Sequence, residues 1–523
     1  MGFKIGMDFG TTNSTVAYIS SSSQQPEAFK FQGPSGYDYI PSCLVYREEG
    51  QISIGRAAFD DMDEPGAIFC NNLKMILPMP PPQQQKTDWT KTKSPTTVIS
   101  DYLRTILTEP DEDSSSFSRQ KGPIEGIVLS VPHVWAKDPA HEGRSALKSI
   151  IEGLECPLIQ LISEPVAAAA YFSYNYQQRQ QTNFAGNLLV CDMGGGTFDV
   201  TLCRVQPGKI EEVFNDGNGR KNMGKAGVQF DTNLLTAKGL LKNTPEFFEA
   251  YKKLQEYKSN HKSEITKLIN NAIEEPDFRV KKILRVGRYE FNFDDIEQAF
   301  AEISKGIESV MKRVAVSIDS QKLKVDHIFF VGGFSEFILV RETIKKALGV
   351  EQGDVRLISD IDNETVCYAI AYGAALIAND LVAVEERYAH SIGVCANRVV
   401  QCDTENYHQQ EEILLPIIKA GGKLSEYEHP VFSDTVVSIS IKFPVVRIYV
   451  HLSSEDKPHV HQLPESLELP HANLPNNRWR VGMRINKSKV VYLIFEDTIH
   501  KKQKEYELGD IIRQMFGTLM VEE

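Results

Sequence analysis

An internal repeat constrains the fold of this chain more strongly than any other feature of its sequence. Residues 3–19 read FKIGMDFGTTNSTVAYI, and residues 188–205 read LLVCDMGGGTFDVTLCRV. Each copy places an aspartate, Asp8 or Asp192, after an apolar strand and follows it with a glycine-containing turn, a threonine and a second β-branched strand. The two aspartates lie 184 positions apart. That spacing fits one α/β lobe and far exceeds a solenoid repeat, so the sequence predicts two related lobes.

The residues of the repeat indicate a phosphate site. Glycine turns let backbone N–H groups approach phosphate oxygens closely, and threonine hydroxyls add donors. Asp8 and Asp192 could hold Mg²⁺ through its coordinated waters, and Asp199 would lie one pleat beyond the second turn, near an attacking water. A tight turn that needs glycine is the alternative for DMGGG alone, and the repetition weakens it. The chain has no GxxxxGK(S/T) loop and no GxGxxG that opens a helix, which excludes two common phosphate loops.

A third glycine pair ends the apolar strand in DHIFFVGGFSEF, residues 326–337. In a doubly wound lobe, such a pair lets a flat ring approach the backbone. Gly332 and Gly333 therefore predict the adenosine side of a nucleotide site, with a plain turn between strand and helix as the alternative.

Composition limits the class of protein. The 523 residues are 41% apolar and 24% charged, as in a soluble globular chain with several cores. A net charge of -13 disfavours nucleic acid as a partner, because phosphate backbones recruit basic surfaces. Eight cysteines without a CxxC pair favour reduced thiols. The sequence has no apolar run of about eighteen residues that predicts a membrane span, and its start lacks the apolar core of a signal peptide. We expect a cytoplasmic protein.

Strand and helix patterns alternate through most of the chain, which is typical of an α/β fold. The predicted strands include 124–132 and 187–194, and the predicted helices include 162–174, 364–380 and most of 236–318. Four polar segments are predicted to be surface insertions: 21–25, 78–86, 111–118 and 174–183.

The pattern changes near residue 385. Residues 432–454 and 489–497 are β-rich, and residues 510–517 fit one short helix or strand. We therefore predict a nucleotide-binding domain of two lobes over 1–384 and a β-sandwich-like domain over 385–523, which is too short to include a helical lid.

These elements, in this order, resemble the actin-like ATPase superfamily, and most closely its seventy-kilodalton heat-shock protein (DnaK-type) family. The motifs that carry the resemblance are GMDFGTTNSTVAYI, LLVCDMGGGTFDVTL, SVPHVWAKDPAHEGRSA, ISEPVAAAAY, FFVGGFSEF and AYGAAL, which together span residues 1–380. The resemblance implies two duplicated ribonuclease-H-like lobes. Within the family, VPHVW, VGGFSE and the tail segment IYVHLSSEDKPHV resemble the divergent, lidless member-twelve (12A/12B-like) subfamily.

The resemblance also implies a site for ATP or ADP with Mg²⁺, and K⁺ as a further candidate ion, in a cleft between the lobes. Asp8 and Asp192 would organise the metal. Lys74, in NNLKMIL, and Glu164 and Asp199 match family residues near the γ-phosphate and the attacking water. The residues that would bind the terminal phosphates are Gly10, Thr11, Thr12, Gly194, Gly195, Gly196 and Thr197, the last also a candidate catalytic group.

The chain departs from the family pattern at three places. Glu336 replaces a basic residue that stacks on adenine, and the helix expected at 246–268 offers only Glu256 and Lys258 as approximate ribose contacts. The connector LVAVEERYAHSIGV, residues 381–394, is interrupted by Glu385, Glu386 and Arg387. These departures put coupling between the domains, and docking of cochaperones, in doubt.

Three functions remain open at this point. The first is a slow ATPase of chaperone type, whose nucleotide state biases binding of a protein client or signalling partner through the β-domain. The second is a non-hydrolysing, nucleotide-dependent adaptor, which the altered connector favours. The third is a sugar kinase, which the DnaK-like motifs and the β-rich tail oppose.

Overall fold

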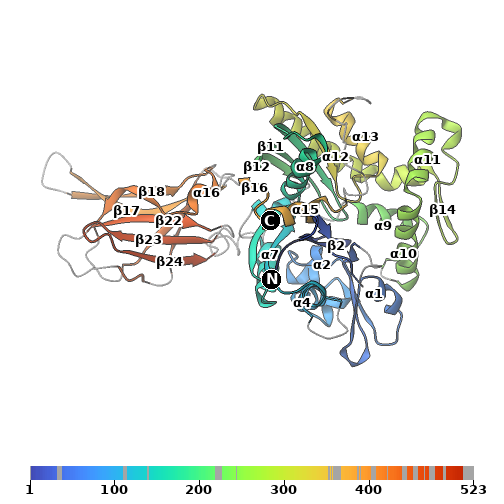
Figure 1. Cartoon of the computed structure of the whole chain (residues 1–523), viewed down its shortest axis with the longest axis horizontal. Coiled ribbons are helices and arrows are strands. Elements are labelled where there is room, and N and C mark those ends of the chain that lie inside the picture. Colours follow the sequence, from blue (N-terminus) through green and yellow to red (C-terminus); the bar gives the residue numbers. More distant parts are fainter. Residues whose placement is uncertain are drawn as a thin grey trace. The chain divides into compact units, whose positions relative to one another are not determined.

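The chain divides into two compact units, Met1–Ala136 with Gly143–Val384, and Lys137–Glu142 with Glu385–Glu523. The first unit contains two lobes. In Figure 1 the label β2 lies in the first lobe, and the labels β11 and β12 lie in the second. The structure, a computed structural model, describes residues 2–31, 38–109, 115–137, 141–217, 226–242, 244–350, 354, 356, 367–385, 388, 390–401, 408–420, 422–438, 444–451, 457–463, 466–469, 478–486 and 490–509.

The first lobe is built on a mixed sheet with the strand order β3-β2-β1-β8-β9 and β4 beside β2. β1 pairs antiparallel with β2, its partner in the first glycine hairpin, and parallel with β8. The strands are β1 Phe3–Phe9, β2 Asn13–Ile19, β3 Pro26–Ala28, β4 Ile40–Pro41, β8 Ile124–Val131 and β9 Leu158–Ser163.

The second lobe repeats this topology with the strand order β15-β10-β11-β12-β16. β10 pairs antiparallel with β11 across the second glycine hairpin, and parallel with β15. The strands are β10 Gly186–Met193, β11 Phe198–Gln206, β12 Lys209–Gly217, β15 His327–Val331 and β16 Ala383–Glu385. The duplication predicted from the repeat is confirmed, and the two sheets are consistent with the expected actin-like fold.

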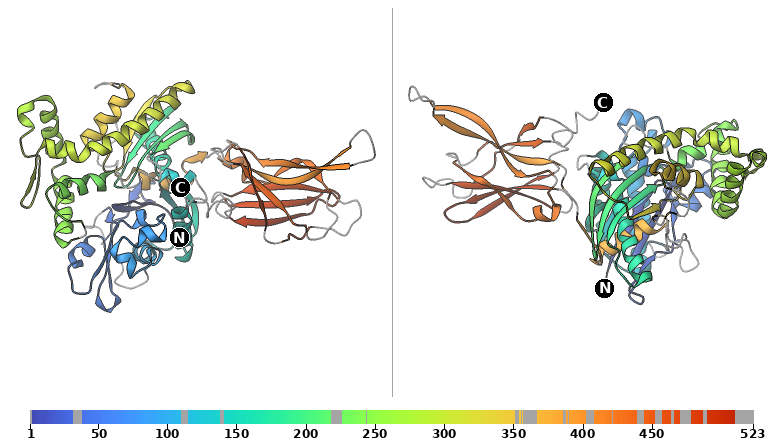
Figure 2. Two further views of the ribbon diagram at one scale, coloured as in Figure 1. Left: turned by 180° about the vertical axis from the view of Figure 1, so that it is seen from behind. Right: turned by 90° about the horizontal axis from the view of Figure 1, so that it is seen from above.

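Both faces of the second sheet are covered, which explains why its strands are nearly continuous apolar runs. On β10, Leu189 and Cys191 pack into the core that holds α12 (Phe293–Ser320), and Leu188 and Val190 pack into the core that holds α8 (Glu164–Gln180). Figure 2 shows α12 lying along one face of the green strands.

Two alanine-rich helices, α8 and α15 (Ala369–Ala378), join the lobes. A Cβ at Gly373 would collide with the Ala167 carbonyl, and one at Gly6 would collide with the backbone of α15. α15 therefore packs backbone to backbone on both α8 and β1, and glycine at these positions allows the close approach.

Peripheral elements complete the two lobes. In the first lobe they are β5 Leu44–Tyr46, β6 Ile52–Ile54, β7 Ile68–Cys70, α1 Arg56–Asp61, α2 Leu73–Ile76, α3 Pro81–Gln84, α4 Pro95–Leu107, α5 Phe117–Lys121, α6 His133–Lys137 and α7 Glu142–Gly153. In the second they are α9 Gly227–Ala237, α10 Pro245–Asn260, α11 Lys262–Glu274, β13 Leu284–Val286, β14 Tyr289–Phe291 and α13 Ile338–Leu348.

Two sequence expectations are wrong, and a third falls partly on residues that the structure does not describe. The segment 174–183 is not an insertion as a whole, because α8 continues to Gln180, and Tyr176 packs against Phe184 with ring centroids 5.4 Å apart. The stretch 236–318 is mostly helical, as predicted, with the β13–β14 hairpin between α11 and α12, but the single helix expected at 246–268 ends at Asn260 and a second helix begins at Lys262. Residues 364–366 of the predicted helix 364–380 lie outside the described residues.

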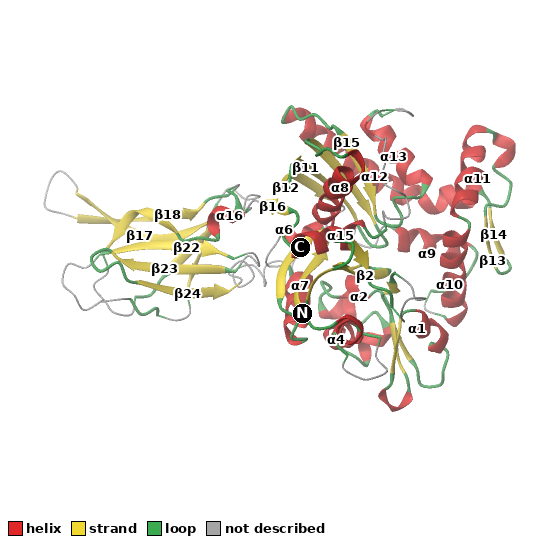
Figure 3. Ribbon diagram, viewed as in Figure 1, coloured by secondary structure: helices red, strands yellow, loops and turns green. Residues whose placement is uncertain are grey.

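The C-terminal unit is β-rich, as predicted, and contains two four-stranded sheets and one short helix, α16 Leu424–Tyr427, among its described residues (Figure 3). Its core draws on both sheets, with Ile448 and Val450 from one and Val481 and Leu493 from the other. The strands are β17 Ser391–Gln401, β18 His408–Ile418, β19 Val431–Val437, β20 Arg447–His451, β21 His459–Gln462, β22 Trp479–Ile485, β23 Val491–Asp497 and β24 Gln503–Gly509.

Two further expectations fall on residues that this structure does not describe, namely 510–517 and the connector residues Glu386 and Arg387. Glu385, at the end of β16, is buried and forms an ion pair with Lys423 at 2.6 Å. Among the described residues, no helix is long and apolar enough to cross a membrane.

Candidate functional site

The two aspartates of the repeat occupy equivalent positions, near the ends of the central strands β1 and β10. Asp8 lies opposite Ser130 of β8 in the parallel register, and the Ser130 hydroxyl donates to Asp8 Oδ1 at 2.8 Å. Asp192 is buried, and its Oδ2 has no hydrogen-bond partner among the described residues. A buried carboxylate oxygen without a donor is costly, so this atom indicates a site for a cation or its waters.

The two glycine-containing turns face one another. A Cβ at Gly195 would collide with Thr12 Oγ1, and a Cβ at Gly196 would stand 2.7 Å from Thr11 Oγ1. Gly194, in contrast, has open space where a Cβ would point. The turns thus bring together the glycines and threonines that the sequence assigns to one phosphate site.

Hydrogen bonds from residues outside the two turns fix the backbone carbonyls of both turns. The Ser42 hydroxyl donates to the Gly10 carbonyl at 2.7 Å, and the Ser42 N–H donates to the Thr12 carbonyl at 2.8 Å. In the second lobe, the Val228 N–H donates to the Gly195 carbonyl at 2.9 Å. Sequence reasoning missed Ser42 and Val228, which are distant from the turns along the chain.

Lys74 and Glu164 form a buried ion pair. Lys74 lies on the short helix α2, which follows Asn72, a residue with a positive φ of 53°. Its ammonium group contacts Glu164 Oε1 at the start of α8, and the two residues are only 2% and 6% exposed. The family resemblance implies that Lys74 lies near the γ-phosphate and Glu164 near the attacking water, and the structure brings the two side chains into direct contact.

Asp199 is enclosed by groups from both lobes. Its carboxylate accepts hydrogen bonds from the Thr197 side chain and from the backbone N–H of His133 on α6. On β12, Gly217 lies opposite Asp199 in register, and a Cβ there would stand 2.5 Å from Asp199 Oδ1. Its Oδ2 has no partner among the described residues, so one oxygen remains available to a ligand or water.

Three carboxylates of the site share an unusual electrostatic environment. Burial, reinforced by the charge of Glu164, raises the pKa of Asp8 to about 6 and that of Asp199 to about 7. The same causes, with the charges of Asp199 and Asp8, raise the pKa of Asp192 well above its usual value. Carboxyl groups that hold protons near neutral pH mark sites that bind cations or transfer protons.

The glycine pair after β15 divides into two roles. Gly332 has a φ of +81°, and a Cβ there would stand 2.5 Å from Asp192 Oδ1. Gly333 is exposed, with open space around it. The Phe334 and Ser335 N–H groups donate to the Met193 carbonyl at 3.0 Å. Gly332 therefore packs against Asp192, a predicted metal-holding residue, and Gly333 is the member of the pair that could face a ring.

Two residues at which the chain departs from the family pattern, Glu336 and Lys258, form ion pairs within this chain. Glu336 forms an ion pair with Lys262, the first residue of α11. Lys258 binds both carboxylate oxygens of buried Asp231, at 2.5 and 2.7 Å, while Glu256 is exposed. The Lys258 ammonium group is thus paired with Asp231. Lys262 lies beside Glu336, at the predicted adenosine side of the site.

The residues present fit a magnesium nucleotide. The turns offer a cradle that side chains would fill, Lys74 supplies a buried cation, and two buried carboxylate oxygens lack donors. No cluster of three or more metal-ligating side chains occurs among the described residues.

Comparisons with known proteins identify the family of this chain. The family model described as Hsp70 protein matches residues 89–388. The chaperone protein HscA homolog of Rickettsia typhi is 26% identical over 410 residues, covering 72% of this chain and 58% of that protein. The chaperone protein DnaK of Thermotoga neapolitana is 25% identical over 391 residues, covering 72% of this chain and 60% of that protein.

The chain therefore spans about 60% of the length of these curated relatives. The family match covers more than half of the chain and includes Glu164, the second glycine turn and the Gly332–Gly333 pair. This chain belongs to the Hsp70 family.

Proposed function

We propose that this chain binds ATP or ADP with Mg²⁺ between the two facing turns and hydrolyses ATP slowly. One observation carries the proposal. The two glycine turns, at 10–12 and 194–197, and the buried Lys74–Glu164 pair lie around Asp192 and Asp199, whose Oδ2 atoms have no hydrogen-bond partner among the described residues. Phosphoryl transfer depends mainly on positioning and on neutralisation of charge, which these groups supply.

Each group has a distinct task in this proposal. Mg²⁺, when bound, would neutralise charge on the phosphates. Asp8 and Asp192 would hold it, and the backbone of the turns would orient the terminal phosphate. Lys74 would place a positive charge beside the γ-phosphate, with Glu164 fixing its ammonium group. Asp199, whose pKa is about 7, is suited to accept a proton from the attacking water near neutral pH.

We further propose a chaperone role in the cytoplasm, in which the nucleotide state biases how the β-rich unit binds a protein client or partner. The relatives named above are chaperones by name, and the buried free cysteines suit a reducing compartment.

We propose that the chain belongs to the member-twelve subfamily, on the motifs VPHVW and VGGFSE. K⁺ and cochaperones remain candidate partners.

Calorimetric titration of Mg-ATP into the full chain tests the binding step. We expect one site per chain, with affinity that falls when Mg²⁺ is chelated. Absence of binding would reject the proposal. Binding without turnover would instead favour the nucleotide-dependent adaptor, which uses the same turns but leaves ATP intact.

A further inference from the structure

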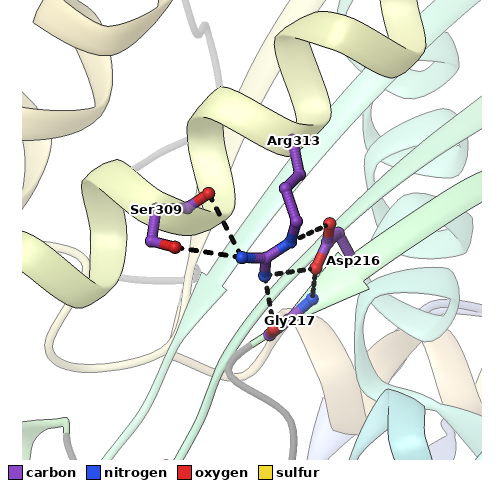
Figure 4. Close-up of polar contacts among 4 residues, drawn as sticks. All are labelled: Asp216, Gly217, Ser309 and Arg313. Carbon is purple, nitrogen blue, oxygen red and sulfur yellow. Dashed lines mark hydrogen bonds and ion pairs between the residues drawn. The ribbon is translucent and has the colours of Figure 1, made fainter.

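Arg313 forms a clamp with Asp216 and Gly217 at the end of β12, where Gly217 lies opposite Asp199. Arg313 on α12 donates from Nε to Asp216 Oδ2 at 2.8 Å and from Nη2 to Asp216 Oδ1 at 2.7 Å. The same Nη2 donates to the Gly217 carbonyl at 3.1 Å. Figure 4 shows the guanidinium group directed from the helix to the strand end.

The clamp is closed on both sides. Arg313 Nη1 donates to the carbonyl and the hydroxyl of Ser309, at 3.3 and 3.0 Å, which fixes the guanidinium group on its own helix. Asp216 Oδ1 also accepts from the Gly217 N–H at 2.7 Å. Bidentate arginine–carboxylate pairs restrain geometry more tightly than a lysine pair, because the planar fork matches the carboxylate.

The clamped residues support Asp199 through the sheet register. Gly217 lies opposite Asp199, and the carboxylate of Asp199 occupies the space where a side chain at position 217 would stand. A movement of the strand end would therefore move the surface on which Asp199 rests. Displacements of about 1 Å in a catalytic group can cost about a hundredfold in rate.

Stability alone does not account for this arrangement. Arg313 is 50% exposed and Asp216 is 23% exposed, so solvent screening limits what their ion pair contributes to folding. Arg279 offers a comparison in the same lobe, because it also binds two carboxylates, Asp294 and Glu297, and among the described residues no hydrogen bond or ion pair joins its side chain to the site. Arg313 differs from Arg279 because it contacts Gly217, the residue that lies opposite Asp199.

We propose that Arg313 is a positioning residue for ATP hydrolysis, acting through Asp216 and Gly217 to hold Asp199 in place. The inference rests on the proposed ATPase function. It predicts that loss of the clamp slows hydrolysis while nucleotide affinity stays nearly unchanged, because the described hydrogen bonds of Arg313 are to Ser309, Asp216 and Gly217, which lie outside the proposed phosphate turns.

Single-turnover ATP hydrolysis and calorimetric ATP affinity should be measured on the full chain for the wild type, Arg313→Ala and Arg313→Lys, with Arg279→Ala as the matched control. We expect Arg313→Ala to lower the rate about tenfold or more, with affinity within about twofold. Arg313→Lys should fall between it and the wild type, because lysine provides a charge without the fork. Arg279→Ala should hydrolyse like the wild type.

Other outcomes would overturn the inference. They are a wild-type rate in Arg313→Ala, an equal loss in Arg279→Ala, or a parallel loss of affinity. Asp199→Asn serves as the inactive reference. If the wild type does not exceed Asp199→Asn, the ATPase proposal fails and the inference fails with it. If the wild type exceeds Asp199→Asn and Arg313→Ala matches the wild type, the ATPase proposal stands and the positioning role of Arg313 is rejected. If Arg313→Ala does not fold, Arg313→Lys tests the clamp, and Gly217→Ala, which crowds Asp199 directly, tests separately whether displacement of Asp199 slows hydrolysis.

Discussion

The Lys74 ammonium group and the Glu164 carboxylate contact each other in a buried ion pair, although 90 residues separate them along the chain. α2 presents the lysine and the first turn of α8 presents the glutamate. Both residues are buried, at 2% and 6% exposure, so removal of either charge would leave the other with less compensation.

Removing one partner of this pair should destabilise the protein. Lys74→Ala leaves the Glu164 carboxylate buried without its cation, and we expect a loss of about 3–5 kcal/mol in the free energy of unfolding. The double variant Lys74→Met with Glu164→Gln should recover most of that loss, because no charge is then buried alone. Urea denaturation of the two variants and of the wild type measures the difference. Equal destabilisation by the single and double variants would contradict the pairing.

Adjacent glycines in the second turn should respond differently to alanine. A Cβ at Gly195 collides with Thr12, whereas a Cβ at Gly194 meets nothing. We expect Gly195→Ala to lower the melting temperature and to prevent the two turns from closing on each other. Gly194→Ala should leave the melting temperature of the nucleotide-free protein nearly unchanged and weaken ATP binding, because its methyl group would enter the phosphate space. Thermal denaturation with and without nucleotide separates the two effects, and identical behaviour would show that the turns do not face each other in this way.

Asp192 should be required for metal-dependent binding. Asp192→Asn removes the negative charge that would hold Mg²⁺ while keeping the shape of the side chain. We expect calorimetric affinity for Mg-ATP to fall at least tenfold, and affinity for ATP without Mg²⁺ to change little. Unchanged affinity in the presence of Mg²⁺ would exclude a role for Asp192 in holding the metal.

The site carboxylates should make the metal-free protein more stable as the pH falls. Folding raises the pKa of Asp8 to about 6 and that of Asp199 to about 7, so between about pH 4 and pH 7 the folded state binds more protons than the unfolded state. Their contribution is therefore fully present below the unfolded pKa and is lost as the pH rises through 6 to 7, at no more than about 1.4 kcal/mol per pH unit for each group.

The pH effect can be assigned by substitution. Asp199→Asn cannot titrate, so the stability of this variant in chelator should depend less steeply on pH between 5 and 7 than that of the wild type. Asp319→Asn, which changes an exposed aspartate on α12, is the control. A pH profile for Asp199→Asn that parallels the wild type would contradict a raised pKa at Asp199.

Local motifs in the sequence predicted the centre of the site, because a strand, an aspartate and a glycine turn lie within a few consecutive residues. The supporting groups could not be found in that way. Ser130 meets Asp8, and Gly217 meets Asp199, through strand register, which pairs residues that are distant or unremarkable in sequence.

Tertiary packing explains the errors in secondary structure. The polar end of α8 reads as a loop, but Tyr176 and Phe184 pack on each other and hold the last turns in helical form. The β13–β14 hairpin is too short to show a period of its own, and it lies between two long helices. Local pattern is a weak guide where neighbouring elements determine the conformation.

Single-turnover hydrolysis of labelled ATP by the wild type and by Lys74→Ala tests the central claim most directly. Both proteins should bind ATP when its affinity is measured in parallel under the conditions of the assay. We predict slow release of phosphate from the wild type and none above background from Lys74→Ala. Bound ATP that remains intact on the wild type, at the same level as on Lys74→Ala, would contradict the claim that this chain is an ATPase.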